Sequence, residues 1–316
     1  MALKALFVIA ITTSRMIFPG ISAISPDVQG KVSDTDPAVR SLTMQLLSND
    51  TAAKPQASVT LPTGLKLGET AVMQMSAVTP STAAKGSDKV TLKTYWGSSE
   101  AVEPGQPSVK ESDNVEPRSQ QDYKTIAVWP GQSKKGKAGQ ISENASAVGI
   151  YNLTADYTGS TFVTLSSEQD FLAPIRLIGL DKNVDLDKPI KVEWNAVPNA
   201  LAYMVTAYGG NADETITWTA GSEAGAALNV DNTAFAREEL DKLIEQKALL
   251  SATTTSATIP AEAFKGSTGV MLLVTAIGAD KVQDGDAIRT EVIVRSTACA
   301  PLYSAGRPKK QAAQGK

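Results

Sequence analysis

Residues 149–165 read GIYNLTADYTGSTFVTL. Apolar and polar side chains alternate along the first nine residues, and Tyr151 and Leu153 fall on the same side of the chain. Gly159 then provides a turn, and a second alternating run follows at residues 161–165. Two runs of period two on either side of a glycine-containing turn are the pattern of a β-hairpin. The segment therefore predicts two antiparallel strands.

The same period recurs on the N-terminal side of this hairpin. Residues 90–96 alternate cleanly, residues 71–76 alternate imperfectly, and residues 124–129 form another short candidate strand. Long polar stretches at residues 98–123 and 131–146 lie between the strands and are either elaborate surface loops or mobile segments. Regular short strands with turn signals are typical of an antiparallel sandwich.

Two segments resemble known β-sandwich families. The Gly-x-Tyr-x-Leu-x-Ala-x-Tyr run that begins at Gly149 is similar to a late strand of an immunoglobulin-like domain. Residues 190–205, IKVEWNAVPNALAYMV, resemble a fibronectin type III domain, in which a strand tryptophan is followed by a tyrosine on the next strand. Trp194 and Tyr203 fill those two places, and Pro198-Asn199 would form the turn between them.

The fibronectin resemblance covers residues 187–297 and includes the later strands within residues 255–276. It departs from the family at Phe264, which replaces the usual leucine, and at Val270, where the family usually has tyrosine. The resemblance implies a β-sandwich used as a spacer, adhesive or binding module. It carries no catalytic residues to transfer, since a fold does not specify a function.

A helical insertion interrupts this second region. Asn232 or Thr233 is a candidate N-cap, and the residues that follow place an apolar stripe at helical spacing. The stripe consists of Ala236, Leu240, Leu243, Ile244 and Lys247.

The sequence therefore predicts an all-β chain of two tandem antiparallel β-sandwiches. The predicted divisions are a signal peptide (1–23), an extended leader with a short helix (24–66), an immunoglobulin-like sandwich (67–179), a fibronectin type III-like sandwich with a helical insertion near 233–247 (180–298), and a basic tail (299–316).

The N-terminus has the features of a secretory signal peptide. Lys4 gives a positive start, residues 5–13 form a short apolar-leaning run, and Ala23 is a small residue at a plausible cleavage position. The run is far shorter than the roughly 20 residues that span a bilayer. Two alternatives stay open, which are an ordinary buried N-terminal strand and an uncleaved anchor.

The leader that follows is polar and interrupted by proline. Asp36-Pro37 looks like an N-cap followed by proline at the first helical position. Val39, Leu42 and Leu46 then fall at helical spacing, so one short helix is expected there.

Composition excludes several chemistries. The chain has 316 residues, a net charge of −3, no histidine and one cysteine. Histidine-dependent catalysis and histidine-ligated metal centres are therefore excluded, as are an intrachain disulfide and a thiolate cluster. The charge gives no basis for a nucleic-acid-binding surface.

No catalytic motif is complete, so we expect no enzyme, no cofactor and no metal. Residues 131–138 nearly match a phosphate-binding loop but end in Ala138, where a magnesium-binding hydroxyl is required. No serine lies in a nucleophile elbow. Two acidic groups, one at Asp181, Asp185 and Asp187 and the other at Asp280, Asp284 and Asp286, lack calcium-loop spacing.

Three aromatic residues near strand ends are the candidate ligand-binding residues, namely Tyr95, Trp96 and Trp129. Exposed aromatic rings on a sandwich can stack on sugar rings, whereas buried ones belong to the core, and the sequence leaves both readings open. Cys299 is either a free thiol or a site for pairing with a partner.

Together these features predict a secreted or cell-envelope protein that acts as a structural or interaction module. Its expected partners are proteins, either further copies of itself in a surface layer, matrix or extracellular filament, or other surface proteins. The alternative is a carbohydrate- or peptide-binding accessory module. Neither nucleic acid nor a membrane span of the mature chain is expected.

Overall fold

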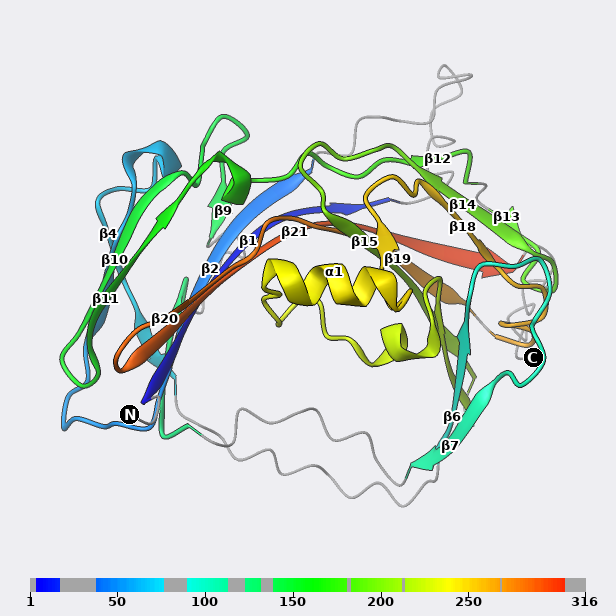
Figure 1. Ribbon diagram of the computed structural model, residues 1–316, viewed down its shortest axis with the longest axis horizontal. Helices are drawn as coiled ribbons and strands as arrows, with labels where there is room; N and C mark the ends of the chain where they lie inside the picture. The colour runs from blue at the N-terminus through cyan, green and yellow to red at the C-terminus, as the bar shows by residue number, and fades with distance from the viewer. Residues whose placement is uncertain are drawn as a thin grey trace, which may run out of the picture.

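The computed structural model describes residues 4–17, 38–76, 90–112, 123–131, 139–180, 183–211, 214–267 and 269–304. Within these ranges the chain is built mainly of β-strands and has one α-helix. The strands form one large mixed sheet and two small sheets (Figure 1).

The large sheet is strongly curved and arches over the helix (Figure 1). Its strand order is β5 (Gln74–Ser76), β8 (Thr125–Trp129), β2 (Val39–Ser48), β1 (Ala5–Met16), β21 (Ile288–Ser304), β19 (Val270–Ile277), β15 (Ala202–Gly210), β16 (Glu214–Thr219), β6 (Val90–Trp96) and β7 (Ser108–Ser112). Four short strands pair beside this path, namely β9 (Gln140–Ile141), β13 (Asn183–Val184), β17 (Leu250–Ser251) and β20 (Lys281–Asp284).

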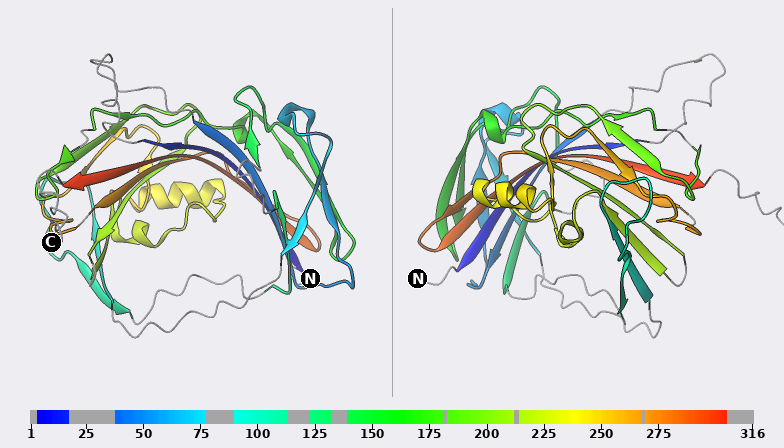
Figure 2. Two further views of the ribbon diagram at one scale, coloured as in Figure 1. Left: turned by 180° about the vertical axis from the view of Figure 1, so that it is seen from behind. Right: turned by 45° about the vertical axis from the view of Figure 1, so that its right-hand side comes forward.

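The two small sheets pack against one face of the large sheet, near its two ends (Figure 2). The first, which we call the end sheet, has the order β11 (Gly159–Leu165), β10 (Gly149–Ala155), β3 (Ala57–Thr60) and β4 (Thr70–Val72). The second has the order β12 (Leu177–Ile178), β14 (Ile190–Trp194) and β18 (Ser256–Ile259). Short 3₁₀ turns are η2 (Thr63–Leu65), η3 (Ser167–Gln169) and η4 (Glu223–Ala227).

Strand β1 occupies the middle of the large sheet. It pairs antiparallel with β2 and parallel with β21, so both of its edges are hydrogen-bonded. Phe7, Ile9 and Ile11 alternate into the core and are fully buried. The apolar run that resembles a signal peptide therefore lies in this structure as a buried N-terminal strand, the first of the two alternatives that the sequence left open.

The two predicted sandwiches are not clearly distinguishable in the sheet arrangement. A single hydrophobic core contains Phe7 of β1, Tyr151 of the end sheet and Trp194 of the other small sheet. The long strand β21 pairs with β1 along most of its length, with β20 near its start and with β19 towards its end. Shared strands thus join the two halves of the chain in one large sheet. The predicted mostly β fold is confirmed, whereas the predicted arrangement as two tandem sandwiches is not clearly present.

Residues 39–48 form strand β2 rather than the short helix that the sequence predicted. Apolar residues in this segment fit both a helical spacing and the alternation of a strand. The alternating set of Leu42, Met44 and Leu46 is the one that is fully buried. Pairing with β1 on one side and β8 on the other fixes this register. Residues 39–48 of the predicted leader are consequently part of the large sheet, and residues 57–60 form strand β3 of the end sheet. Residues 24–37 of the predicted leader lie outside the described ranges.

The predicted helical insertion is present as α1 (Arg237–Glu245), which begins four residues after Thr233. Leu240 is buried in a second, smaller core with Met204 and Ile277, which lie on the face of the large sheet opposite the main core. The helix therefore covers part of the concave face of the arch (Figure 1). At the C-terminal end, β21 continues to Ser304, so residues 299–304 are strand rather than tail.

A buried tyrosine makes a specific contact at each of the two small sheets. Trp194 and Tyr203 have ring centroids 5.5 Å apart, and the Tyr203 hydroxyl accepts a hydrogen bond from the Val197 N–H at 2.8 Å. In the end sheet, the buried Tyr151 hydroxyl donates to the Ala147 carbonyl at 2.9 Å, a contact of the tyrosine-corner type. Burial and the nearby Asp170 carboxylate both raise the pKa of Tyr151.

Removing the Tyr151 hydroxyl is expected to destabilise the fold measurably. Tyr151→Phe leaves the Ala147 carbonyl without its donor, and the loss of a buried hydrogen bond costs about 1 to 3 kcal/mol. Tyr157→Phe is the matched control, because the buried Tyr157 hydroxyl has no hydrogen-bond partner. Urea unfolding measures both variants, and an equal loss in the two would refute a specific role for the Tyr151 contact.

Candidate functional site

The three sequence-predicted aromatic residues do not form one binding platform. Trp129 lies on β8, whereas Tyr95 and Trp96 lie on β6, and six strands of the large sheet separate β8 from β6. All three side chains are half-buried. The structure therefore brings no two of these side chains together, since Tyr95 and Trp96 are consecutive in one strand and Trp129 lies near the opposite end of the sheet.

Tyr95 and Trp96 point to opposite faces of the sheet because they are consecutive in a strand. Tyr95 pairs with the fully buried Trp218 and packs against the main core, where burial raises its pKa. Trp129 also packs against that core. Trp96 lies on the concave face. The Gln106 side chain accepts a hydrogen bond from the Trp96 backbone N–H at 3.1 Å and donates one to the Trp96 carbonyl at 2.9 Å.

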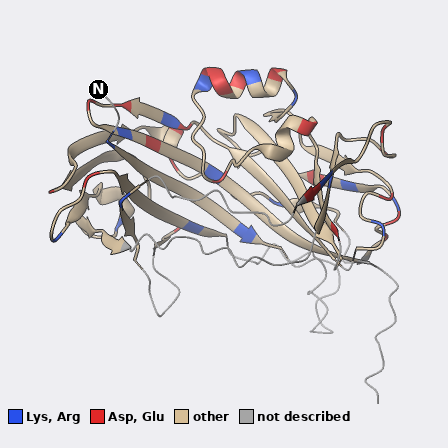
Figure 3. Ribbon diagram, turned by 90° about the horizontal axis from the view of Figure 1, so that it is seen from below, with Lys and Arg blue, Asp and Glu red and all other residues tan. Residues whose placement is uncertain are grey.

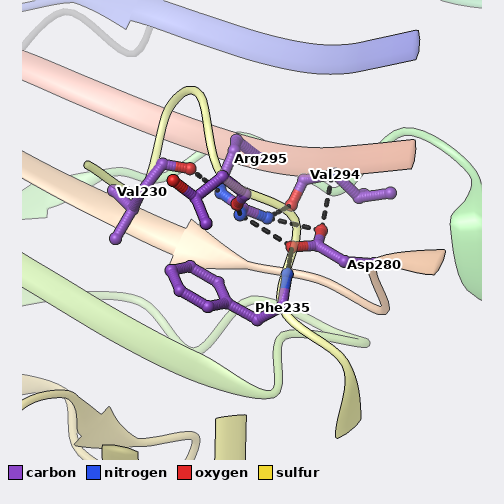
Figure 4. A network of polar contacts seen from close by, with 6 residues as sticks. Val230, Phe235, Asp280, Val294 and Arg295 are labelled. Carbon is purple, nitrogen blue, oxygen red and sulfur yellow. Dashed lines mark hydrogen bonds and ion pairs between the residues drawn. The ribbon is translucent and has the colours of Figure 1, made fainter. Parts of the chain in front are cut away.

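A buried ion pair lies at β21, beside the segment that leads into α1 (Figure 4). The Arg295 guanidinium donates to both carboxylate oxygens of Asp280, at 2.6 and 2.7 Å, and both side chains are 1% exposed. Its remaining N–H groups donate to the carbonyls of Val230, Thr233 and Val294, each at 2.8 Å. All five donors of the guanidinium are thus satisfied.

The Asp280 carboxylate is equally well occupied. It also accepts hydrogen bonds from the N–H groups of Val294 and Phe235, at 2.9 and 3.0 Å. The network ties β21 to residues 230–235, which lead into α1, and the Phe235 ring lies 5.7 Å from the Arg295 guanidinium carbon. A fully paired network of this kind holds the segment that leads into α1 against β21.

A cavity of about 330 Å³ adjoins this network at the N-terminal end of α1. Its size is that of a small ligand pocket. Two of its charged lining groups are already paired, however, because Asp280 binds Arg295 and Arg237 binds Asp241 at 3.1 Å. The cavity is therefore lined in part by groups that already serve the fold, and we assign it no ligand.

Three of the acidic residues noted in the sequence pair with basic side chains, and Asp181 lies outside the described ranges. Asp280 pairs with Arg295, Asp284 pairs with Arg289 at 3.3 Å, and Asp185 lies 3.5 Å from Lys188. In the part of the chain that the structure describes, no three His, Cys, Asp or Glu side chains are placed to hold a metal ion together. Residues 132–138 of the phosphate-loop-like segment lie outside the described ranges.

The most distinctive exposed surface is the outer face of the end sheet. Strand pairing places ten side chains on this face, and none of them is charged. Phe162 is 59% exposed, Ile150 51% and Val72 70%. We call this set the outer face, and it consists of Ser58, Thr60, Thr70, Val72, Ile150, Asn152, Thr154, Ser160, Phe162 and Thr164.

The edges of the same sheet are protected. The Lys281 side chain donates to the Thr164 carbonyl at 2.8 Å, and the Gln283 amide donates to the Phe162 carbonyl at 3.0 Å. Both donors come from β20 and occupy backbone acceptors of the edge strand β11 (Figure 1). Strand β4 at the other edge has only three residues. Short or blocked edges disfavour strand addition, so the face of this sheet is what it offers to a partner.

A second uncharged surface crosses the concave face, beside α1. Register partners and one side-chain contact join residues from six neighbouring strands, which we call the concave strip. Its members are Met16, Cys299, Met271, Tyr208, Thr217 and Thr94. Figure 3 shows the contrast with α1, the helix at the top of the view, which carries many acidic and basic residues, whereas the strands are largely uncharged.

No family model matches this chain, and no curated protein or solved structure matches it either. The functional argument therefore depends on these surfaces.

Sequence reasoning missed the outer face although its signal was present. In the alternating run from Gly149, attention to Tyr151 and Leu153 identified the buried side of the strand. The other side carries Ile150, Asn152 and Thr154, which is an unusual solvent face because it includes an exposed isoleucine and no charge.

In the described residues, no helix has the length and apolar character needed to cross a bilayer.

Proposed function

We propose that this protein is a non-enzymatic interaction protein that binds protein surfaces, including further copies of itself, through the outer face of the end sheet. The observation that carries the proposal is an exposed sheet face with three large apolar side chains and no charged residue. Contiguous exposed apolar surface rimmed by polar groups is typical of interaction sites.

The chemistry of this face favours an uncharged partner surface. Covering a side chain such as Phe162 or Ile150 contributes about 1.5 to 3 kcal/mol when it becomes fully buried. The surrounding threonine and serine hydroxyls can exchange hydrogen bonds with water for hydrogen bonds with a partner. A charged partner group would lose hydration there without gaining an opposite charge.

The setting of the proposal comes from the sequence. A role in a surface layer, matrix or filament outside the cell belongs to the proposal, as does the resemblance to a fibronectin type III module. Two features support that resemblance, which are the contact of Trp194 with Tyr203 and the position of the β12-β14-β18 sheet across the core from β21, β19, β15 and β16. The outer face lies within residues 58–164, so binding through it does not require cleavage after Ala23, whereas the setting outside the cell depends on the signal peptide that the sequence predicted.

A charge on the outer face is expected to abolish self-association. Sedimentation velocity of the full chain over a hundredfold concentration range should show concentration-dependent larger species. Phe162→Lys and Ile150→Lys should each return the protein to a monomer, because a buried ammonium has no partner on this face. Ile178→Lys is the matched control, since Ile178 is 53% exposed on β12 and lies outside the outer face. A wild-type protein that is monomeric throughout would rule out self-association.

Glycan binding is a second candidate for the same face. Phe162 lies directly opposite Asn152 in the strand register, so an exposed ring adjoins an amide that can hydrogen-bond to sugar hydroxyls. Phe162→Leu separates the two functions. It keeps apolar area for a protein partner and removes the ring on which a sugar would stack, so loss of binding in a glycan screen with retained self-association would favour two separate activities.

A further inference from the structure

Three sulfur-bearing side chains lie on the concave strip, and two of them are in contact. Cys299, Met271 and Met16 come from the three neighbouring strands β21, β19 and β1 (Figure 1). The Cys299 thiol donates to the Met271 thioether, with 3.1 Å between Sγ and Sδ. Met16 is the register partner of Cys299 and therefore projects from the same face beside it.

Solvent can reach these residues. Met16 is 46% exposed and Met271 37%, while Cys299 is half-buried between them. The chain has no other cysteine, so the thiol has no disulfide partner within one copy. No acidic or basic residue belongs to the concave strip.

We propose that Cys299, Met271 and Met16 form a three-sulfur site for a soft monovalent metal ion, Cu(I). Thiolate and thioether ligands select soft ions, whereas carboxylate, carbonyl and water ligands suit magnesium, calcium and manganese. Zn²⁺ usually requires four ligands from Cys, His, Asp or Glu, and here only one such side chain is in place. This inference does not rest on the proposed function, because the strip and the outer face are different surfaces.

The geometry requires only a small adjustment. Metal–sulfur bonds of about 2.3 Å place two sulfur atoms of a trigonal site roughly 4 Å apart. The Sγ and Sδ atoms, now 3.1 Å apart, would therefore separate by about 1 Å to admit the ion. Methionine has three rotatable side-chain bonds and accommodates such a shift easily. Met16 can close the third side from its exposed position.

The binding step is a ligand exchange without electron transfer. Cu(I) replaces the proton of the Cys299 thiol, and that proton passes to solvent as the Cu–S bond forms. The two thioethers bind through lone pairs and lose no proton.

The test is a competition titration of the reduced full chain with Cu(I) against the chromophoric chelator bicinchoninate. We expect one Cu(I) per chain and three sulfur neighbours near 2.3 Å by X-ray absorption. Cys299→Ser should abolish binding. Met271→Leu and Met16→Leu keep side-chain volume and should each weaken binding by at least about tenfold, since even changes outside the ligand set cost that much.

The control is Met75→Leu, which lies on β5 at the far edge of the sheet and should bind as the wild type does. Ag(I) provides a redox-inert repeat of the titration. Unchanged affinity in Cys299→Ser would overturn the proposal. Unchanged affinity in both methionine variants would also overturn it, because the thiol alone would then account for binding.

Discussion

A chain that begins at residue 24 is expected not to fold. Removing residues 1–23 removes β1, and with it Phe7, Ile9 and Ile11, each of which is fully buried. Truncating one such side chain typically costs about 2 to 5 kcal/mol. The combined loss for three such side chains is comparable to the whole free energy of unfolding of an ordinary domain, which is about 5 to 15 kcal/mol. The backbone groups of β2 and β21 that face β1 would also lose their partners.

The comparison is between residues 1–316 and residues 24–316, measured by circular dichroism and thermal unfolding. A point variant separates the strand from the length of the chain: Ile9→Asp should be strongly destabilising, whereas Ser14→Asp, at an exposed position of the same strand, should have little effect. If residues 24–316 fold with an unchanged melting temperature, β1 is dispensable and a signal peptide cleaved after Ala23 explains the N-terminus.

Breaking the Arg295–Asp280 pair is expected to produce the second large effect. Arg295→Met leaves the buried Asp280 carboxylate without its opposite charge, and the carbonyls of Val230 and Thr233 without their donors. Removing one partner of a buried ion pair costs about 3 to 5 kcal/mol. The damage should extend to α1, because the pair holds the segment that leads into the helix.

Arg289→Met is the matched control on the same strand. Arg289 pairs with Asp284 and Glu291, but its side chain is 36% exposed, and an exposed pair contributes about 0 to 1 kcal/mol. Urea unfolding followed by fluorescence gives both free energies. Combining Arg295→Met with Asp280→Leu should recover part of the loss, since no charge then stays buried. Equal losses for Arg295→Met and Arg289→Met would show that burial adds nothing to the pair.

Local features of the fold were predictable because they depend on short-range patterns. The hairpin of residues 149–165 is present as β10 and β11 because its period-two pattern and Gly159 agree with each other. The helix near residue 240 is present because its apolar stripe has one period and one neighbouring surface to cover.

The arrangement of the large sheet was not predictable, because it depends on pairing between distant segments. Strand β1 is paired with β21, and Ala5 lies opposite Ile288 in this pairing. The two strands are therefore more than 280 residues apart in the sequence. Nothing local to residues 5–16 distinguishes a central strand from a short signal-peptide core, since both are apolar runs of similar length. The helical spacing of Val39, Leu42 and Leu46 misled for the same reason, because strand neighbours on both sides decided the conformation.

The candidate surfaces divide in the same way. Trp96 was identified as a residue type, but its place on the concave face follows from pairing with β16. The sulfur cluster could not be inferred from sequence, since Met16, Met271 and Cys299 are brought together only by the strand order β1-β21-β19. The outer face was readable in part, from the uncharged side of a single alternating strand.

The most direct test of the central claim, that β1 and β21 join the two halves in one sheet, is amide hydrogen exchange of the full chain. Backbone groups paired on both sides within a core strand exchange only through large-scale unfolding. We predict that residues 6–14 are among the slowest to exchange and share their rate with the β21 residues paired to them. Exchange of residues 6–14 within seconds, with protection retained in β15 and β19, would contradict the account.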